Sequence, residues 1–297
     1  MNQLAVASHT RELSDALFKN LLVAYDASEA SETALQYAIT LAHNFGSVVT
    51  VVSVPPPSDL AIEMEGGFGR WQAHRQTIEN LDEVGKRLAA QGIRNRLVHR
   101  AGAVSDVLVQ LAAENKVGLL LLGAYGHQRM DHPRLGSTVE FMLRSMPCAV
   151  LTIGPGAVLH GRPVPPTRTL LYGSSLPKRM GPARRFLMAW AKKSGSHVEI
   201  IHVIDPQVEA HDHRNYAQMR AAEAALSKEL QEAGVNAAWS LITGPQAEQI
   251  IERSDAIHAD LILFGLEHIQ PRFEIVGAIS AAIWRASCPV LTVPGPA

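Results

Sequence analysis

The chain has 297 residues, of which 47% are hydrophobic, so it holds enough apolar material for one large or two ordinary domains. Its 27 Lys and Arg residues nearly balance its 28 Asp and Glu residues, which leaves no strong field to attract nucleic acid or an anionic membrane. Residues 1–20 lack the apolar core of a signal peptide. We therefore expect a cytoplasmic protein with no nucleic-acid or membrane partner. Its two cysteines, Cys148 and Cys288, are expected to be buried thiols.

Apolar strand-like segments alternate with helix-like segments along the first half of the chain. Strands are expected at 21–25, 48–54, 96–100, 118–122 and 149–153, with helices at 29–43, 72–90, 105–114 and 137–145. Near-continuous apolar strands are typical of a parallel sheet that helices cover on both faces. The order therefore predicts a doubly wound α/β domain, which binds ligands at the carboxyl ends of its strands.

The second half of the chain repeats this order. Gly46 aligns with Gly195, Gly92 with Gly234 and Gly123 with Gly265. Repeated Pro and Gly between the copies favour an extended spacer. We therefore expect an N-terminal extension (1–19), a first domain (20–154), a linker (155–167) and a second domain (168–297).

A glycine loop follows the strand that ends at Leu122. It contains Gly123 and Gly126, and after nine further residues Gly136-Ser137-Thr138 leads into a helix. Glycines let backbone N–H groups approach an anion, and the start of a helix attracts negative charge. The loop therefore predicts a site for a nucleotide phosphate, the alternative being that these glycines only form tight turns.

Asp26 stands at the end of the first strand. In a doubly wound sheet this strand lies beside the one that ends at Leu122, so Asp26 and the glycine loop could converge on one ligand. A lone aspartate in such a position is otherwise often a turn or cap residue. Ser28 and Glu32, which follow, can be interpreted as residues that start a helix, with Ser28 as its cap.

The spacing G-x2-G-x9-G-[ST] of Gly123, Gly126, Gly136 and Ser137 resembles that of the universal stress protein family. The resemblance covers nearly all of residues 20–293 and corresponds to the tandem two-domain form. It implies two Rossmann-like domains of the adenine nucleotide alpha hydrolase type, with ATP or another adenine nucleotide bound in the first domain.

The same resemblance implies roles for individual residues. Asp26 would lie near the ribose and adenine, and the backbone at Val54 would read the adenine edge. The phosphates would be held by Gly126, Gly136, Ser137 and Thr138, with Gly123 in the loop and His127 able to contact a phosphate. Mg²⁺ could accompany ATP, although no paired carboxylates flank the loop to hold it. No dedicated metal site is expected.

The second copy departs from this pattern. Asp26 is replaced by Ser175, Gly126 by His268 and Ser137 by Ala278. A histidine places a Cβ and a ring where backbone should approach the phosphate, and alanine lacks a hydroxyl donor. We therefore expect one nucleotide per chain, in the first domain.

The leading hypothesis is a nucleotide-binding stress-response regulator with an unidentified protein partner. No catalytic residue is assigned, because no general base is evident, so any ATP hydrolysis would be weak. A slow ATP hydrolase or nucleotide-dependent transferase is one alternative, and a scaffold that binds no nucleotide is another. The apolar segments 149–153 and 289–293 are expected edge strands, through which the two domains could pair within the chain. Homodimers are also possible, and the sequence leaves open whether ATP, AMP or a cyclic nucleotide is bound.

Overall fold

The computed structural model describes residues 17–55, 68–126, 135–173, 181–204, 213–266 and 273–295. Contacts divide the chain into two compact units. The first comprises the described part of Asp15–Ile153 together with Val158–Val164, and the second comprises Gly154–Ala157 and the described part of Pro165–Ala297. No helix in these ranges combines the length and apolarity needed to cross a membrane.

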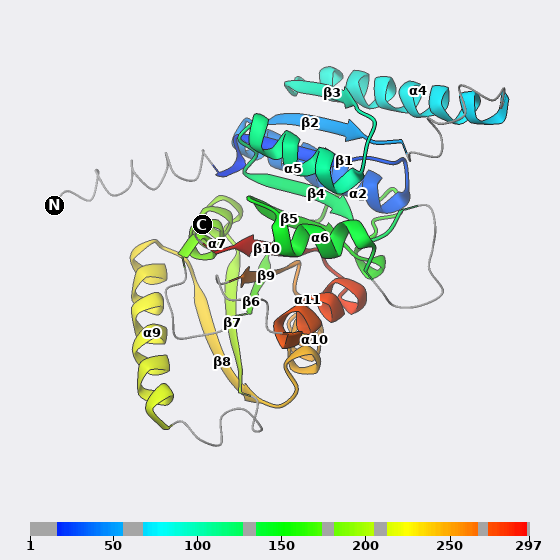
Figure 1. Cartoon of the computed structure of the whole chain (residues 1–297). Coiled ribbons are helices and arrows are strands. Elements are labelled where there is room, and N and C mark those ends of the chain that lie inside the picture. Colours follow the sequence, from blue (N-terminus) through cyan, green and yellow to red (C-terminus); the bar gives the residue numbers. More distant parts are fainter. Residues whose placement is uncertain are drawn as a thin grey trace. The chain divides into compact units, whose positions relative to one another are not determined.

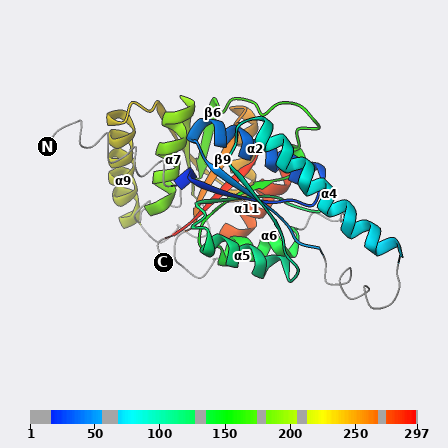
Figure 2. The same ribbon diagram turned by 90° about the horizontal axis from the view of Figure 1, so that it is seen from above.

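The first unit contains five parallel strands in the order β3-β2-β1-β4-β5. They are β1 (Asn20–Ala24), β2 (Val48–Ser53), β3 (Asn95–His99), β4 (Leu119–Gly123) and β5 (Ala149–Ile153). Helices cover both faces, α2 (Glu29–Phe45) and α4 (Phe68–Ala90) on one, α5 (Val104–Glu114) and α6 (Ser137–Ser145) on the other (Figures 1 and 2). The predicted doubly wound fold is therefore confirmed. Because β1 pairs with both β2 and β4, the strand order reverses at β1 and β4.

The second unit repeats this topology with the order β10-β9-β6-β7-β8, again all parallel. Its strands are β6 (Thr169–Gly173), β7 (His197–Ile204), β8 (Ala237–Thr243), β9 (Leu261–Leu266) and β10 (Val290–Pro294). Its helices are α7 (Gly181–Ser194), α9 (His213–Glu232), α10 (Gln246–Ala256) and α11 (Phe273–Arg285). The short 3₁₀ helix η1 (Pro155–Ala157) packs against α11 in the same unit.

Two glycine pairs show that the copies share local backbone conformation. Gly46 and its counterpart Gly195 both have φ of 67°, and Gly92 and Gly234 have φ of 70° and 71°. These left-handed angles are readily adopted by glycine and end the preceding helices. At Gly46 the N–H also donates to the Ala42 carbonyl, 2.8 Å away. The aligned glycines therefore mark equivalent helix ends.

The core of the first sheet lies along β4. The side chains of Leu119–Leu122 are at most 3% exposed, as expected for a strand covered on both faces. Cys148 and Cys288 are buried as predicted, and burial raises the pKa of each thiol to about 12. Helix α4 begins at Phe68, four residues before the predicted start at residue 72. The predicted start was too late because Gly69 weakens the helical sequence pattern at this end.

The Pro- and Gly-rich segment between the copies is partly packed rather than a fully solvated spacer. Val158 and Leu159 are buried in the first unit, where the Leu159 N–H donates to the Thr33 hydroxyl at 3.1 Å. In the sequence, these two apolar residues are surrounded by the prolines and glycines from which an extended spacer was predicted. A short apolar stretch thus anchors this part of the segment to α2.

Candidate functional site

The end of β1 forms a tight turn into α2. The Asp26 Oδ1 accepts a hydrogen bond of 3.0 Å from the Ser28 N–H, and Ala27 between them has φ of 63°. Ser28 caps α2, since its hydroxyl accepts from the Ser31 N–H at 3.2 Å. Asp26 is thus a turn residue and Ser28 a helix cap. A role for Asp26 in ligand binding is compatible with this turn, because the Asp26 side chain remains exposed at the end of the strand.

Gly126 lies directly beside Asp26. A Cβ placed on Gly126 would come 2.8 Å from the Asp26 Oδ2, closer than carbon and oxygen tolerate. Because β1 and β4 are paired neighbours, both residues stand at the same carboxyl edge of the sheet. The structure thus brings together the aspartate and the glycine loop, although Asp26 and Gly126 are 100 residues apart in sequence.

Gly123 and Gly136 lie at the two ends of the glycine loop. A Cβ on Gly123 would lie 2.7 Å from the Ala30 Cβ, so glycine lets β4 approach α2 closely. Gly136 is the N-cap of α6 and its N–H donates to the Ala124 carbonyl at 3.2 Å. Ser137 and Thr138 then form the first turn of α6, where backbone N–H groups have no partner within the helix.

Val54 and His127 complete the predicted set. Val54 follows the last residue of β2 and is half-buried. Since the Tyr25 N–H donates to the Val52 carbonyl at 2.9 Å, the ends of β1 and β2 lie side by side. His127, with the rest of 127–134, falls outside the described residues.

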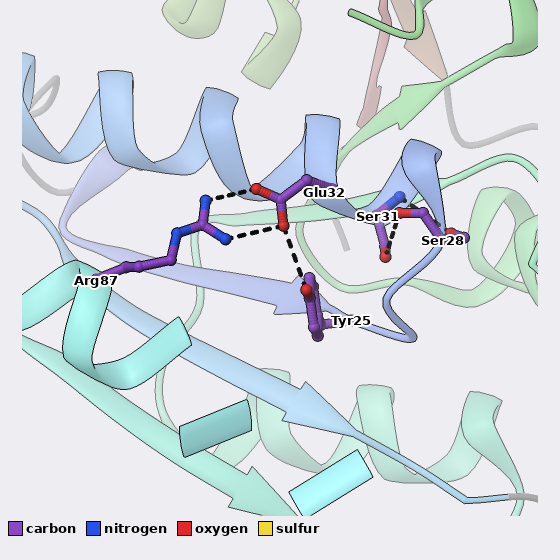
Figure 3. A network of polar contacts seen from close by, with 5 residues as sticks. All are labelled: Tyr25, Ser28, Ser31, Glu32 and Arg87. Carbon is purple, nitrogen blue, oxygen red and sulfur yellow. Dashed lines mark hydrogen bonds and ion pairs between the residues drawn. The ribbon is translucent and has the colours of Figure 1, made fainter. Parts of the chain in front are cut away.

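A polar network that the sequence did not reveal lies next to this turn (Figure 3). The Glu32 carboxylate on α2 accepts from both terminal nitrogens of Arg87 on α4, at 3.1 and 2.5 Å, and from the Tyr25 hydroxyl at 3.2 Å. Burial, with Glu32 adding to it, raises the pKa of Tyr25 to about 12, and the hydrogen bond to Glu32 raises the pKa of Arg87. No short motif links residues 25, 32 and 87, so only the fold could reveal this cluster.

The second unit differs at the corresponding places. Gly277 and Ala278, which align with Gly136 and Ser137, lie inside α11 because this helix begins at Phe273. Their N–H groups are therefore within the range that bonds inside the helix. Ala278 is also only 2% exposed. The other predicted changes, Ser175 and His268, lie outside the described residues.

Aromatic side chains stand near the end of the second sheet. The Tyr172 hydroxyl lies 3.5 Å from the Cβ position of Gly265, and the Phe264 ring 2.7 Å from that of Gly173. The aligned residues in the first unit are the smaller Val23 and Leu122. The second unit therefore has a larger side chain than the first unit beside Gly265, the glycine that corresponds to Gly123.

Metal ligands are sparse over the described ranges. Within them, no group of three or more His, Cys, Asp or Glu residues is arranged to hold a metal ion. The polar groups that the first unit does gather are helix-start N–H groups, which donate hydrogen bonds, and the Asp26 carboxylate, which accepts them. Such a set suits an anion together with hydroxyl or amine donors of a nucleoside.

Comparison with known proteins identifies the family. The sequence pattern of the universal stress protein family matches residues 17–154 and again 168–294. The chain belongs to the universal stress protein family. Both copies therefore carry the fold of that family, in the tandem arrangement that the repeat predicted.

Individual universal stress proteins are similar to parts of the chain. One from Methanocaldococcus jannaschii is 26% identical over 145 residues, covering 46% of this chain and 82% of that protein. Another, from a Synechocystis species, is 30% identical over 132 residues, covering 44% of this chain and 41% of that protein. A crystal structure of a universal stress protein from Archaeoglobus fulgidus has a TM-score of 0.72 and 19% identity, covering 93% of this chain and 98% of that one. At that identity the likeness concerns the fold.

Proposed function

We propose that the first domain binds an adenine nucleotide, with ATP as the main candidate, and that the protein acts as a nucleotide-dependent regulator. The observation that carries this proposal is the juxtaposition of the Asp26 carboxylate and Gly126, 2.8 Å from Oδ2 to the Cβ position, at the reversal of strand order. Ligands of doubly wound sheets bind at such a reversal, outside the carboxyl ends of the strands.

The nucleotide would be held from two sides. Asp26 would accept hydrogen bonds from the ribose or adenine, and the backbone at Val54 would face the base. The phosphates would lie at the start of α6, against Gly126, Gly136, Ser137, Thr138 and His127. Gly123 would act indirectly, by letting β4 and α2 approach. Free N–H groups and the positive end of the helix dipole supply the attraction at α6. Any Mg²⁺ would be bound mainly through the phosphates, as this ion keeps several waters.

The equivalent site of the second domain would bind no nucleotide. Gly277 and Ala278 lie within α11, so the helix start that would receive phosphate is displaced. We take the domains as 20–154 and 168–297, with 155–167 between them. In this proposal the second domain has a role in domain pairing or in binding a regulatory protein partner. In the same proposal, the protein is cytoplasmic and can form homodimers.

The proposal is tested by titrating ATP calorimetrically into the wild-type protein and a Gly126→Val variant. We expect saturable binding to the wild type and at least about tenfold weaker binding to the variant, because the new side chain meets the Asp26 carboxylate. Gly277→Ala is the matched control, since a Cβ there meets nothing within 4 Å. That variant should bind ATP normally and be about 0.5–1 kcal/mol more stable.

Two further outcomes would identify a different function. Phosphate release from ATP that disappears in Gly126→Val would indicate a slow hydrolase at the same site. Absence of saturable ATP binding, together with no adenine nucleotide in heat-released extract of the purified protein, would contradict the proposal and favour a scaffold. Mass spectrometry of a copurified nucleotide would distinguish ATP from AMP and cyclic nucleotides.

A further inference from the structure

Ser31 occupies a buried position just behind the Asp26 turn. It is the third residue of α2 and only 2% exposed. Its hydroxyl donates to the Ser28 carbonyl at 3.0 Å and accepts from the Asp26 N–H at 3.4 Å. Its own N–H donates to the Ser28 hydroxyl at 3.2 Å. One small side chain thus links the Asp26 backbone to the first turn of α2, and Figure 3 shows it beside Ser28.

Asp26 itself is exposed, so packing does not hold it in place. The residue after it, Ala27, adopts a left-handed φ of 63°, which alanine disfavours by about 1 kcal/mol. Hydrogen bonds must therefore maintain this turn. Two of them are on either side of Ala27: the Ser28 N–H to the carboxylate, and the Asp26 N–H to Ser31.

The second copy of the repeat provides an independent comparison. At the same offset of 149 residues, Asp26, Ser28 and Ser31 align with Ser175, Pro177 and Met180. Proline has no N–H to donate, and methionine has no hydroxyl. The copy that lacks the aspartate therefore also lacks both groups that orient it. A serine needed only for the common fold would have no reason to be lost along with Asp26.

We propose that Ser31 is a positioning residue for nucleotide binding, which acts by holding the Asp26 turn so that the carboxylate faces Gly126. This inference rests on the proposed function for its effect on affinity. Ser31 touches no ligand in this arrangement. It pre-organises the turn, so that Asp26 meets the nucleoside without first being ordered.

The test is a double-mutant cycle on ATP affinity, measured by calorimetry on the full chain. Ser31→Ala should weaken ATP binding about 3- to 10-fold, the range for one lost hydrogen-bonding group. In an Asp26→Ala background the same change should have almost no effect, because its target is gone. Ser31→Thr keeps a hydroxyl and should bind more tightly than Ser31→Ala. Normal binding by Ser31→Ala, or equal losses in both backgrounds, would overturn the inference.

A matched control separates positioning from general damage to a buried serine. Ser47 is also buried, at 3% exposure, and its hydroxyl has no hydrogen-bond partner within the described residues. It directly precedes β2, at the opposite end of the sheet from Val54. Ser47→Ala should leave ATP affinity unchanged, and an equal loss in this variant would overturn the specific role of Ser31.

A second measurement on the nucleotide-free protein separates this inference from the proposed function. The Ser28 N–H should exchange slowly with solvent deuterium, because it donates to the Asp26 carboxylate, and Asp26→Ala should speed that exchange. Ser31→Ala should speed it by about 3-fold or more, since the turn is no longer held. If the wild type fails to bind ATP while this result holds, the proposed function is wrong and the role of Ser31 in the turn stands. An unchanged exchange rate at Ser28 in Ser31→Ala overturns that role.

Discussion

Tyr25 is a residue beside the candidate site whose acidity the fold changes. Its hydroxyl donates to Glu32, and partial burial is the main reason that the pKa of this phenol rises from 10 to about 12. The neighbouring carboxylate strengthens the effect, since a tyrosinate would be repelled by it. Tyr25 therefore stays neutral through the physiological pH range and into strongly alkaline solution.

This pKa predicts a loss of stability at alkaline pH. Between pH 10 and about 12 the unfolded chain releases the Tyr25 proton while the folded protein keeps it. The folded state then binds more protons, so the free energy of unfolding falls as pH rises through this window. Tyr25→Phe should lack this contribution and lose less stability than the wild type between pH 9 and 11. Urea unfolding at both pH values measures the difference, and parallel losses in the two proteins would contradict the prediction.

At the scale of elements, an ion pair between Glu32 and Arg87 connects α2 to α4. The pair is bidentate, and Glu32 is 29% exposed at its side chain, so solvent screens it less than a fully surface pair. Because α2 begins at the Asp26 turn, this ion pair joins the helix that starts at the candidate site to α4. A helical pattern predicts each helix, but it cannot predict which charges meet between them.

A double-mutant cycle measures the strength of this contact. With Glu32→Gln and Arg87→Met we expect a coupling of about 1 kcal/mol in the free energy of urea unfolding. The exposed pair Arg75 and Glu79 within α4 is the matched control, with side chains 61% and 52% exposed. Its coupling should be about 0.3–0.5 kcal/mol. Equal coupling in the two cycles would show that the α2 to α4 contact adds nothing beyond an ordinary surface pair.

At one place between sheet and helix, the second unit has an ion pair where the first unit has uncharged side chains. Glu199 on β7 is 3% exposed and bonds Arg253 on α10 at 2.7 Å, with the Ser240 hydroxyl also donating to it. The residues aligned with Glu199 and Arg253 in the first unit are Thr50 and Leu111. The two units thus share topology while holding helix and sheet together by different interactions.

At the scale of the whole molecule, the asymmetry between the units predicts one nucleotide per chain. Only the first unit combines an aspartate at the end of its first strand with a helix that starts at the glycine loop, among the residues described. Calorimetry should therefore give a stoichiometry near one ATP per chain. Hydrogen exchange should show ATP-dependent protection at the Asp26 turn and the start of α6, but none at α11. Two nucleotides per chain would refute this asymmetry.

The sequence alone determined the fold class and the repeat, because both depend on local patterns. Apolar runs such as Leu119–Leu122 identify buried parallel strands, and paired glycines mark equivalent helix ends. The family spacing also placed Gly123, Gly126 and Gly136 in a strand-to-helix loop, as β4 and α6 now show. The shift in the start of α4 reflects how weakly a helix end is encoded locally.

Only the tertiary structure decided which distant residues meet. It placed Gly126 against Asp26, joined Tyr25 to Glu32 and Arg87, and linked the Asp26 backbone to Ser31. These contacts depend on strand order, helix packing and turn conformation, which no single stretch of sequence encodes. The sequence also could not show that α11 begins before Gly277. A glycine followed by a small residue is typical of a helix start, and this pattern occurs in both copies. Local pattern thus specified the elements, and packing specified the site.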